Sequence, residues 1–297
     1  MKDFYKPGWV DDPESVEIIC ELQPFSHWGK VEASNVPNYS LPDHVFPWEM
    51  YEQLTGKPWP SRSQGSVGSC VGFGTVAAIE ATIVAEVFNN EPEDVRDLCT
   101  EVCYAGSRVE VGKNKIPARS DGSIGAWAAE FCKSFGVIDR GVYLKYDLKK
   151  YDEARCRNWG SSGVPDDLES FVRKYPVKTI TKLRNYEDYK QACAQGYFSS
   201  ICSNRGFKMK RDEKGFASPS GVWNHCMAGI GYITGSREGA WICNSWGSSA
   251  HTGPVGEGNP PPCGFYADAE VVDSMIKQGD SWCFSNVQGF PIRNWFI

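Results

Sequence analysis

The sequence predicts an α+β fold whose first half is helical and whose second half is rich in β-strands. Residues 70–88 are apolar almost all round, which is typical of a helix inside a protein, and helical patterns follow at residues 93–108 and 123–136. After a short predicted helix at residues 185–196, β-like runs alternate with turns rich in Gly, Ser and Pro. Helices followed by strands in this way favour an α+β fold of two lobes.

Length and composition limit the kind of protein this can be. A chain of 297 residues is long enough for one large domain or two ordinary ones, and 41% apolar and 23% charged residues are usual for a globular protein. The net charge of −6 gives no basic surface for nucleic acid or for an anionic membrane. The first residues lack the apolar stretch of a secretory signal, and no run is long enough to span a membrane. We therefore expect an intracellular protein that binds neither nucleic acid nor membrane.

Residues 1–40 are expected to form an N-terminal extension. They mix Pro, acidic residues and aromatic residues without a helical or strand period, so we predict an extended arm. Trp9, Phe25 and Trp28 are large apolar side chains, which predict that the arm docks on a protein surface. This segment is thus also the expected contact for protein partners in an assembly.

The rest of the chain is predicted to form two lobes. Residues 41–155 make a mainly helical lobe, and residues 156–297 make a lobe rich in strands. In the predicted helix at residues 123–136, Ser123 is the expected N-cap and Gly136 the expected end. The clearest strand patterns lie at residues 197–204, 225–233, 240–246 and 262–269.

Cys70 stands where a loop rich in Gly and Ser meets the apolar helix. Unpaired N–H groups and the partial positive charge at a helix N-terminus favour a thiolate, which is the nucleophilic form of cysteine. Gly65, Gly68 and Ser69 let the backbone turn sharply before the helix, so that the sulfur can face solvent. From these features alone, a reactive cysteine and a buried core cysteine remain equally open interpretations.

A cysteine nucleophile needs a base, and the chain has four histidines: His27, His44, His225 and His251. His225 begins an apolar, β-like run, which would hold the imidazole on a rigid strand. Asn244 ends a later run and could orient that imidazole, while Trp246 could shield their contact from water. Taken singly, each of these residues is as well explained by ordinary packing or by a turn.

Two further questions concern the oxyanion and the cysteines. Gln64 could donate to an oxyanion through its side-chain amide, with the Cys70 N–H as second donor.

Cys99 and Cys103 are spaced like half of a zinc site, but no second pair of this kind follows them. The sequence therefore predicts neither a metal nor another cofactor.

The ordered set Gln64–Gly65, Gly68–Ser69–Cys70, Asn224–His225 and Asn244–Ser245–Trp246–Gly247 resembles the papain-like cysteine peptidase superfamily. The resemblance covers roughly residues 41–290 and is closer to non-lysosomal, microbial or phage-type members than to cathepsins. It implies a papain-like fold, with a helical left lobe, a right lobe like an antiparallel β-barrel, and an active-site cleft between them.

The resemblance also implies roles for individual residues. Cys70, His225, Asn244 and Gln64 would be catalytic. The substrate would bind along Gly68, Gly122, Ser123, Ile124, Trp223, Asn224 and Trp246, with Trp223 making the second specificity pocket shallow.

The sequence departs from the family's pattern before and after the nucleophile. The family usually has a disulfide cysteine where this chain has Val67, and a tryptophan where it has Val71. The missing cysteine favours a reducing compartment. We also find no long helical inhibitory propeptide before the segment that resembles the mature domain.

The leading hypothesis is thiol-dependent hydrolysis of peptide bonds, by an endopeptidase rather than an exopeptidase. A second hypothesis is a structural or binding component of a larger assembly, such as a phage or virus particle, that keeps the papain-like scaffold with or without activity. A third is a cell-wall amidase of the shorter Cys–His type, although such proteins lack the Asn-Ser-Trp-Gly segment. Acyl transfer to an amine would use the same residues as hydrolysis.

Overall fold

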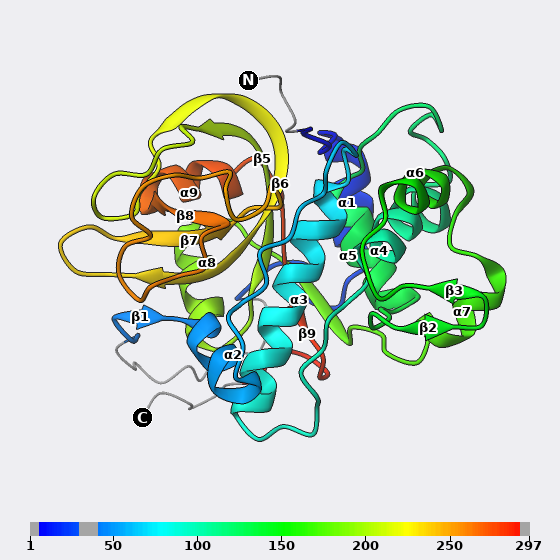
Figure 1. The fold of residues 1–297 in the computed structure, drawn as a ribbon, viewed down its shortest axis with the longest axis horizontal. Helices are drawn as coiled ribbons and strands as arrows, with labels where there is room; N and C mark the ends of the chain where they lie inside the picture. The colour runs from blue at the N-terminus through cyan, green and yellow to red at the C-terminus, as the bar shows by residue number, and fades with distance from the viewer. Residues whose placement is uncertain (1–5, 30–40, 292–297) are drawn as a thin grey trace.

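The computed structural model describes residues 6–29 and 41–291, which form a helical half and a strand-rich half lying side by side (Figure 1). The strand-rich half is a seven-stranded sheet with the order β4-β9-β5-β6-β7-β8, and β1 pairs with β6 beside this path. All paired neighbours in the sheet are antiparallel. The predicted α+β class is therefore confirmed.

The described elements have the following bounds. The strands of the main sheet are β1 (His44–Val45), β4 (Thr179–Lys182), β5 (Ser199–Phe207), β6 (Pro219–Ile233), β7 (Gly239–Cys243), β8 (Gly264–Asp268) and β9 (Asp280–Ser285), and a separate hairpin pairs β2 (Val142–Tyr143) with β3 (Tyr146–Asp147). The helices are α1 (Pro13–Glu21), α2 (Pro47–Thr55), α3 (Cys70–Phe88), α4 (Thr100–Gly106), α5 (Gly125–Ser134), α6 (Glu153–Ser162), α7 (Asp166–Val172), α8 (Tyr186–Ala194) and α9 (Ala269–Ile276), with a π-helical turn η2 (Ser107–Val111) continuing α4.

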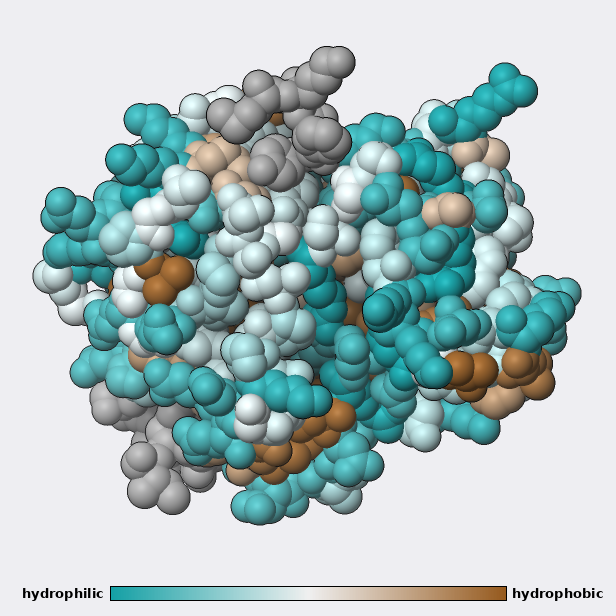
Figure 2. All heavy atoms as spheres, in the orientation of Figure 1, coloured by the Kyte–Doolittle hydropathy of each residue, from teal (hydrophilic) through white to brown (hydrophobic). Residues whose placement is uncertain are grey.

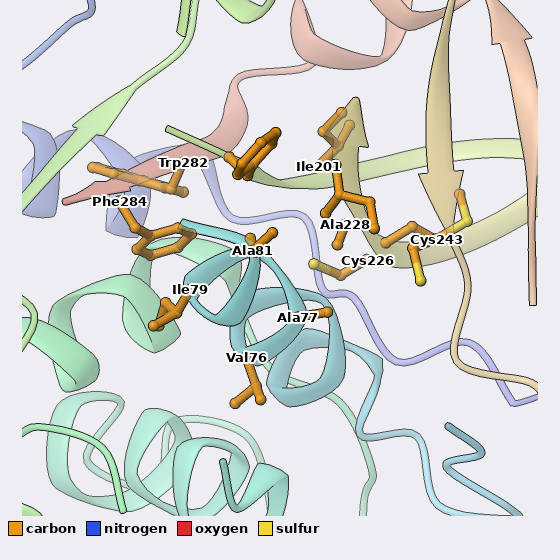
Figure 3. Packing of buried hydrophobic residues seen from close by; sticks show 14 of the residues in the cluster. Val76, Ala77, Ile79, Ala81, Ile201, Cys226, Ala228, Cys243, Trp282 and Phe284 are labelled. Atoms are coloured by element: carbon orange, nitrogen blue, oxygen red, sulfur yellow. The ribbon is translucent and has the colours of Figure 1, made fainter. Parts of the chain in front are cut away.

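The apolar helix α3 lies between the two halves and forms the centre of the core. Figure 3 shows Val76 pointing toward the helical half, while Ile201 and Ala228 of the sheet lie on the opposite side of α3. Within the described ranges, α3 is long and apolar enough to pass for a membrane span, but 83% of its most apolar window is buried inside the protein. Because both faces of α3 pack against protein, its composition is that of a core helix.

Two helices begin later than their sequence patterns predict. Residues 93–99 are not helical, because the Leu98 N–H is bound by the Glu80 carboxylate and the Cys99 N–H by the Ile138 carbonyl, so α4 starts only at Thr100. In α5, Ile124 and not Ser123 occupies the N-cap position, and the helix starts at Gly125. A side chain from another part of the chain binds the first N–H groups of α5, as described below.

The N-terminal extension contains a helix that the sequence analysis missed. Asp12 caps α1 through the Ser15 N–H, Pro13 stands in its first turn, and Val16 and Ile19 are buried. The prediction of an extended arm is therefore wrong for residues 13–21. Because Trp28 is also buried, against Tyr197 and Phe290, the described part of the arm is docked on the protein itself.

Two segments of the chain pack in the other half than the predicted lobe boundary assigns. The predicted boundary after residue 155 falls inside α6, which packs on α4 in the helical half. Near the start of the main domain, β1 already pairs with β6 of the sheet. Figure 2 shows that the viewed face is mostly hydrophilic, with hydrophobic residues in small groups. The exposed hydrophobic residues of the structure include Val142 and Leu144 in the β2–β3 hairpin.

Candidate active site

Cys70 is the first residue of α3 and lies where the helix meets strand β6. Gly65, with φ of 59°, turns the preceding loop in a backbone conformation that favours glycine. The Cys70 sulfur accepts a hydrogen bond from the Cys226 N–H at 3.4 Å. Since Cys226 follows His225 in β6, this contact brings the predicted nucleophile and the predicted base to the same place.

The His225 ring is held by Asn244 at the end of β7. His225 Nε2 lies 2.8 Å from Asn244 Oδ1, and the same oxygen accepts the Ser245 N–H at 2.7 Å. His225 Nε2 is therefore the protonated nitrogen of a neutral ring, which leaves the lone pair on Nδ1. Among the described residues, His225 Nδ1 has no hydrogen-bond partner, so it remains able to accept a proton.

Two tryptophans cover this pair of side chains. The Trp246 ring stacks on the His225 ring with centroids 4.6 Å apart and an interplanar angle of 29°. Trp223 in turn packs on Trp246, with centroids 4.7 Å apart, and on Phe207. His225 and Asn244 are both buried beneath these rings.

The buried Gln64 side chain is fixed by hydrogen bonds at both ends of its amide. Its Oε1 accepts the Ser245 hydroxyl at 2.6 Å, and its backbone N–H donates to the Ser245 carbonyl. Gln64 Nε2 then donates to two carbonyls, those of Val67 at 2.8 Å and Lys6 at 2.7 Å. A donor held in this way is suited to bind a carbonyl oxygen that gains negative charge.

The N-terminal segment occupies the candidate site. We call residues 6–10 the N-terminal strap; it lies between the two halves at the start of α3 (Figure 1). Besides the Lys6 contact with Gln64, the Gly8 and Trp9 N–H groups donate to the Asn224 carbonyl at 3.1 and 2.9 Å. Gly8 also lies against Gly68, so closely that a Cβ at residue 8 would overlap the Gly68 carbonyl.

The strap is held further along by backbone pairing and by one buried side chain. Ser123 pairs with it in both directions, donating to the Gly8 carbonyl at 2.8 Å and accepting the Val10 N–H at 2.9 Å. The Trp9 indole N–H donates to the buried Asp280 carboxylate at 2.8 Å. Asp280 also accepts the first two N–H groups of α5, and so provides the cap that Ser123 does not.

The closed site suppresses charge on both predicted reactants. Burial raises the pKa of Cys70 well above its ordinary value, although hydrogen bonds from the Cys226, Gly8 and Val71 N–H groups act in the opposite direction. Burial lowers the pKa of His225 to about 4, against the hydrogen bond with Asn244, which raises it. Near neutral pH the site therefore holds a thiol and a neutral imidazole.

The predicted substrate-binding residues lie beside the strap, inside the core or over the His225 ring. Gly68, Ser123 and Asn224 contact the strap directly through their backbones. Gly122, with φ of 104°, lies beside them and gives its carbonyl to the buried Arg108, whereas Ile124 is almost fully buried. Trp223 and Trp246 stand over His225, as described above.

Several functional features gave no usable signal in the sequence. Ser245 lies within a recognised motif, but its bond to Gln64 joins two segments far apart in the chain. Asp280 reaches the start of α5 only because β9 runs beside β5. His251 was noted only as one of four histidines, yet it lies 3.0 Å from Asn244 Nδ2.

The cysteines at 99 and 103 have separate surroundings. The Cys99 thiol donates to Glu101, and the Cys103 sulfur lies 3.6 Å from that of Cys132. In the part of the chain that the structure describes, no group of three or more His, Cys, Asp or Glu side chains is arranged to hold a metal ion.

Comparisons with known proteins find relatives by sequence and by structure. No family model matches the chain. Cysteine proteinase 1 of Entamoeba histolytica is 25% identical over 228 residues, which are 72% of this chain and 64% of that relative. This chain thus matches less than two thirds of the length of that protein.

Several solved structures share the fold at low sequence identity. Xylellain, a cysteine protease from Xylella fastidiosa, matches with a TM-score of 0.58 and 15% identity over 97% of this chain and 94% of its own. Digestive procathepsin L 3 of Tenebrio molitor matches with a TM-score of 0.53 and 15% identity, over 91% and 79% of the two chains. Bromelain of Ananas comosus, solved with the E64 inhibitor, matches with a TM-score of 0.50 and 16% identity, over 82% and 99%. The fold is therefore papain-like, and the resemblance of this chain to the papain-like cysteine peptidase superfamily is confirmed.

Proposed function

We propose that this protein hydrolyses peptide bonds with Cys70 as nucleophile. The observation that supports this most directly is a set of linked contacts. Cys70 accepts a bond from the residue after His225, His225 binds Asn244, and Gln64 binds Ser245, the residue after Asn244. The comparisons support a cysteine protease in general terms, and the roles of the individual residues are part of the proposal.

In the proposed reaction, His225 Nδ1 takes the proton of the Cys70 thiol and the sulfur attacks the substrate carbonyl carbon. Gln64 Nε2 and the Cys70 N–H stabilise the oxyanion. The C–N bond breaks as His225 returns its proton to the leaving amine, which leaves a thioester on Cys70. Water then gives a proton to His225 as it attacks the thioester carbon. The C–S bond breaks, the acid is released, and His225 returns the proton to the Cys70 sulfur.

This activity requires the strap to leave the site. The Lys6 carbonyl accepts the hydrogen bond that Gln64 Nε2 would give to a substrate, and the strap backbone is hydrogen-bonded to the backbones of Asn224 and Ser123. A substrate cannot use these groups while the strap does. We therefore propose that the described state is latent, and that opening the strap raises the pKa of His225 and lowers that of Cys70 by removing part of their burial.

The strap also suggests how a substrate is bound. It crosses the site and the chain continues from both of its ends, which favours an endopeptidase. Trp9 occupies a buried position and donates its indole N–H to Asp280, so we propose that this position receives a substrate side chain. Intracellular or virion location, and protein partners bound through residues 1–40, remain predictions.

The test uses the full-length chain in two variants. Trp9→Ala, which weakens the strap, should cleave an unfolded protein substrate faster than the unmodified chain does. Trp9→Ala/Cys70→Ala should not cleave it at all, and product formation that survives loss of Cys70 would exclude this mechanism.

One observation favours the second hypothesis, a papain-like scaffold that acts by binding. The strap closes the site, and both reactants are fully buried and uncharged. If the scaffold hypothesis is correct, Trp9→Ala will expose Cys70 to reagents without producing peptide hydrolysis. The two experiments together therefore separate a latent peptidase from a binding protein.

A further inference from the structure

His251 is a buried histidine that the proposed mechanism does not use. It lies in the segment after β7, is only 3% exposed, and packs its ring on Phe265 with centroids 4.7 Å apart. Its Nε2 atom lies 3.0 Å from Nδ2 of Asn244. Asn244 is thus placed between two histidines, His225 on its oxygen and His251 on its nitrogen.

The neighbours of Asn244 determine which way its amide faces. The Ser245 backbone N–H can only donate, so the Asn244 atom that it contacts must be the oxygen. The amide nitrogen therefore faces His251 and donates to it. A donor on this side requires an unprotonated Nε2, so His251 must be a neutral ring with its proton on Nδ1.

The surroundings of His251 keep the ring neutral. The guanidinium of buried Arg211 is held by the backbone carbonyls of His251 and Gly253, and by two others at Pro262 and Gly264. This positive charge beside the ring disfavours an imidazolium. Burial, Arg211 and His225, in that order, lower the pKa of His251 to about 3.

We propose that His251 is a positioning residue, which accepts a hydrogen bond from the Asn244 amide and so keeps the Asn244 oxygen facing His225. With the amide reversed, its NH₂ group would meet two donors, His225 Nε2–H and the Ser245 N–H. His251 adds an acceptor that only the productive orientation can use. The catalytic consequence rests on the proposed function, but the orientation itself does not.

The first test reads the ring protons directly in the full-length chain. With ¹⁵N-labelled histidine, the four histidines can be assigned by single His→Gln variants, and their ring ¹⁵N shifts distinguish the two neutral tautomers. At pH 7 we expect His251 to carry its proton on Nδ1 and His225 to carry it on Nε2. A charged His251, or a His251 with its proton on Nε2, would overturn the proposal.

The second test compares two substitutions of His251. His251→Gln keeps an acceptor near the position of Nε2, whereas His251→Leu removes it. We expect the His225 ring resonances to stay unchanged in the Gln variant and to shift toward a mixture of tautomers in the Leu variant. Unchanged His225 resonances in a folded Leu variant would also overturn the proposal.

The third readout is kinetic and uses the same two substitutions in the Trp9→Ala chain. Loss of one buried hydrogen bond predicts that His251→Leu lowers kcat about tenfold with little change in KM. His251→Gln should restore kcat to within about threefold, because it restores the acceptor. If the Trp9→Ala chain has no activity, the proposed function fails. The ring ¹⁵N resonances of His225 and His251 would still show whether His251 orients Asn244.

Discussion

Trp9 offers a direct test of whether the strap controls access to Cys70. Its side chain is 5% exposed and donates a hydrogen bond to Asp280, so it is the main side-chain anchor of the strap in its buried position. Trp9→Ala removes both the apolar contact and the hydrogen bond. It leaves the residues around Cys70 and His225 unchanged.

The size of the effect follows from the burial of Trp9. Replacing a buried Trp by Ala costs about 3–5 kcal/mol, and a strap that leaves the site loses these same contacts. Since about 1.4 kcal/mol corresponds to a factor of ten, the open fraction should rise between about one hundred and a few thousandfold, until the chain is fully open. Alkylation of Cys70 through brief opening should accelerate by the same factor.

The assay follows iodoacetamide labelling of Cys70 in the full-length chain by peptide mass spectrometry. Trp28→Ala is the matched control, because Trp28 is equally buried and lies in the same N-terminal extension but packs on Tyr197 and Phe290. It should leave Cys70 labelling unchanged, and labelling of the buried Cys193 should report any general loosening. If Trp9→Ala and Trp28→Ala label Cys70 at the same rate, the strap does not gate the site.

Three other predictions follow from the same geometry. Gly8→Ala should accelerate Cys70 labelling as Trp9→Ala does, because a Cβ there overlaps a backbone carbonyl; an unchanged rate would show that the strap is not seated as described. In the strap-released chain, Gln64→Ala should lower kcat about 100- to 1000-fold, because it removes an oxyanion donor. Ser245→Ala should lower kcat less, because it removes only the hydrogen bond that orients Gln64. A smaller loss for Gln64→Ala than for Ser245→Ala would contradict the role of Gln64 as oxyanion donor. The folded pKa of His225, about 4, lies below its ordinary value of 6.5, so the unfolded state binds the extra proton and stability falls as pH falls through this range. From pH 7.5 to pH 5, the unmodified chain should lose about 2 kcal/mol more stability toward urea than His225→Gln does, because buried His251 contributes a similar loss to both chains. Equal losses in the two chains would refute the buried neutral His225 ring.

The sequence predicted the parts of the site that lie in local motifs. Cys70 at a helix start, His225 at the head of an apolar run and Asn244 directly after a strand each follow from a pattern within a few residues, and the structure brings all three together. The α+β class was predictable for the same reason, because the helical and strand periods of residues 70–88 and 225–233 are local properties.

The contacts that escaped prediction join segments far apart in the chain. Asp280 caps α5 from β9, which no pattern around residues 123–125 indicates, so Ser123 was assigned the wrong role. The helix α1 was missed because its nine residues carry Pro and acidic residues together with only a few apolar ones. The strap was not foreseen because backbone pairing with Ser123 needs no particular side chain.

Burial disfavours charge at the closed site from two sides. The strap takes the hydrogen bonds of Gln64 and Asn224 and lies against Gly68 beside Cys70, while Trp246 stacks on the His225 ring. Burial disfavours the thiolate and the imidazolium together, so the reactants stay uncharged while the strap is in place. Asn244 keeps its place on His225 in this same state. Under the proposed function, the base would therefore already be oriented when the strap opens, and opening would have only to admit water and substrate for the charged pair to form.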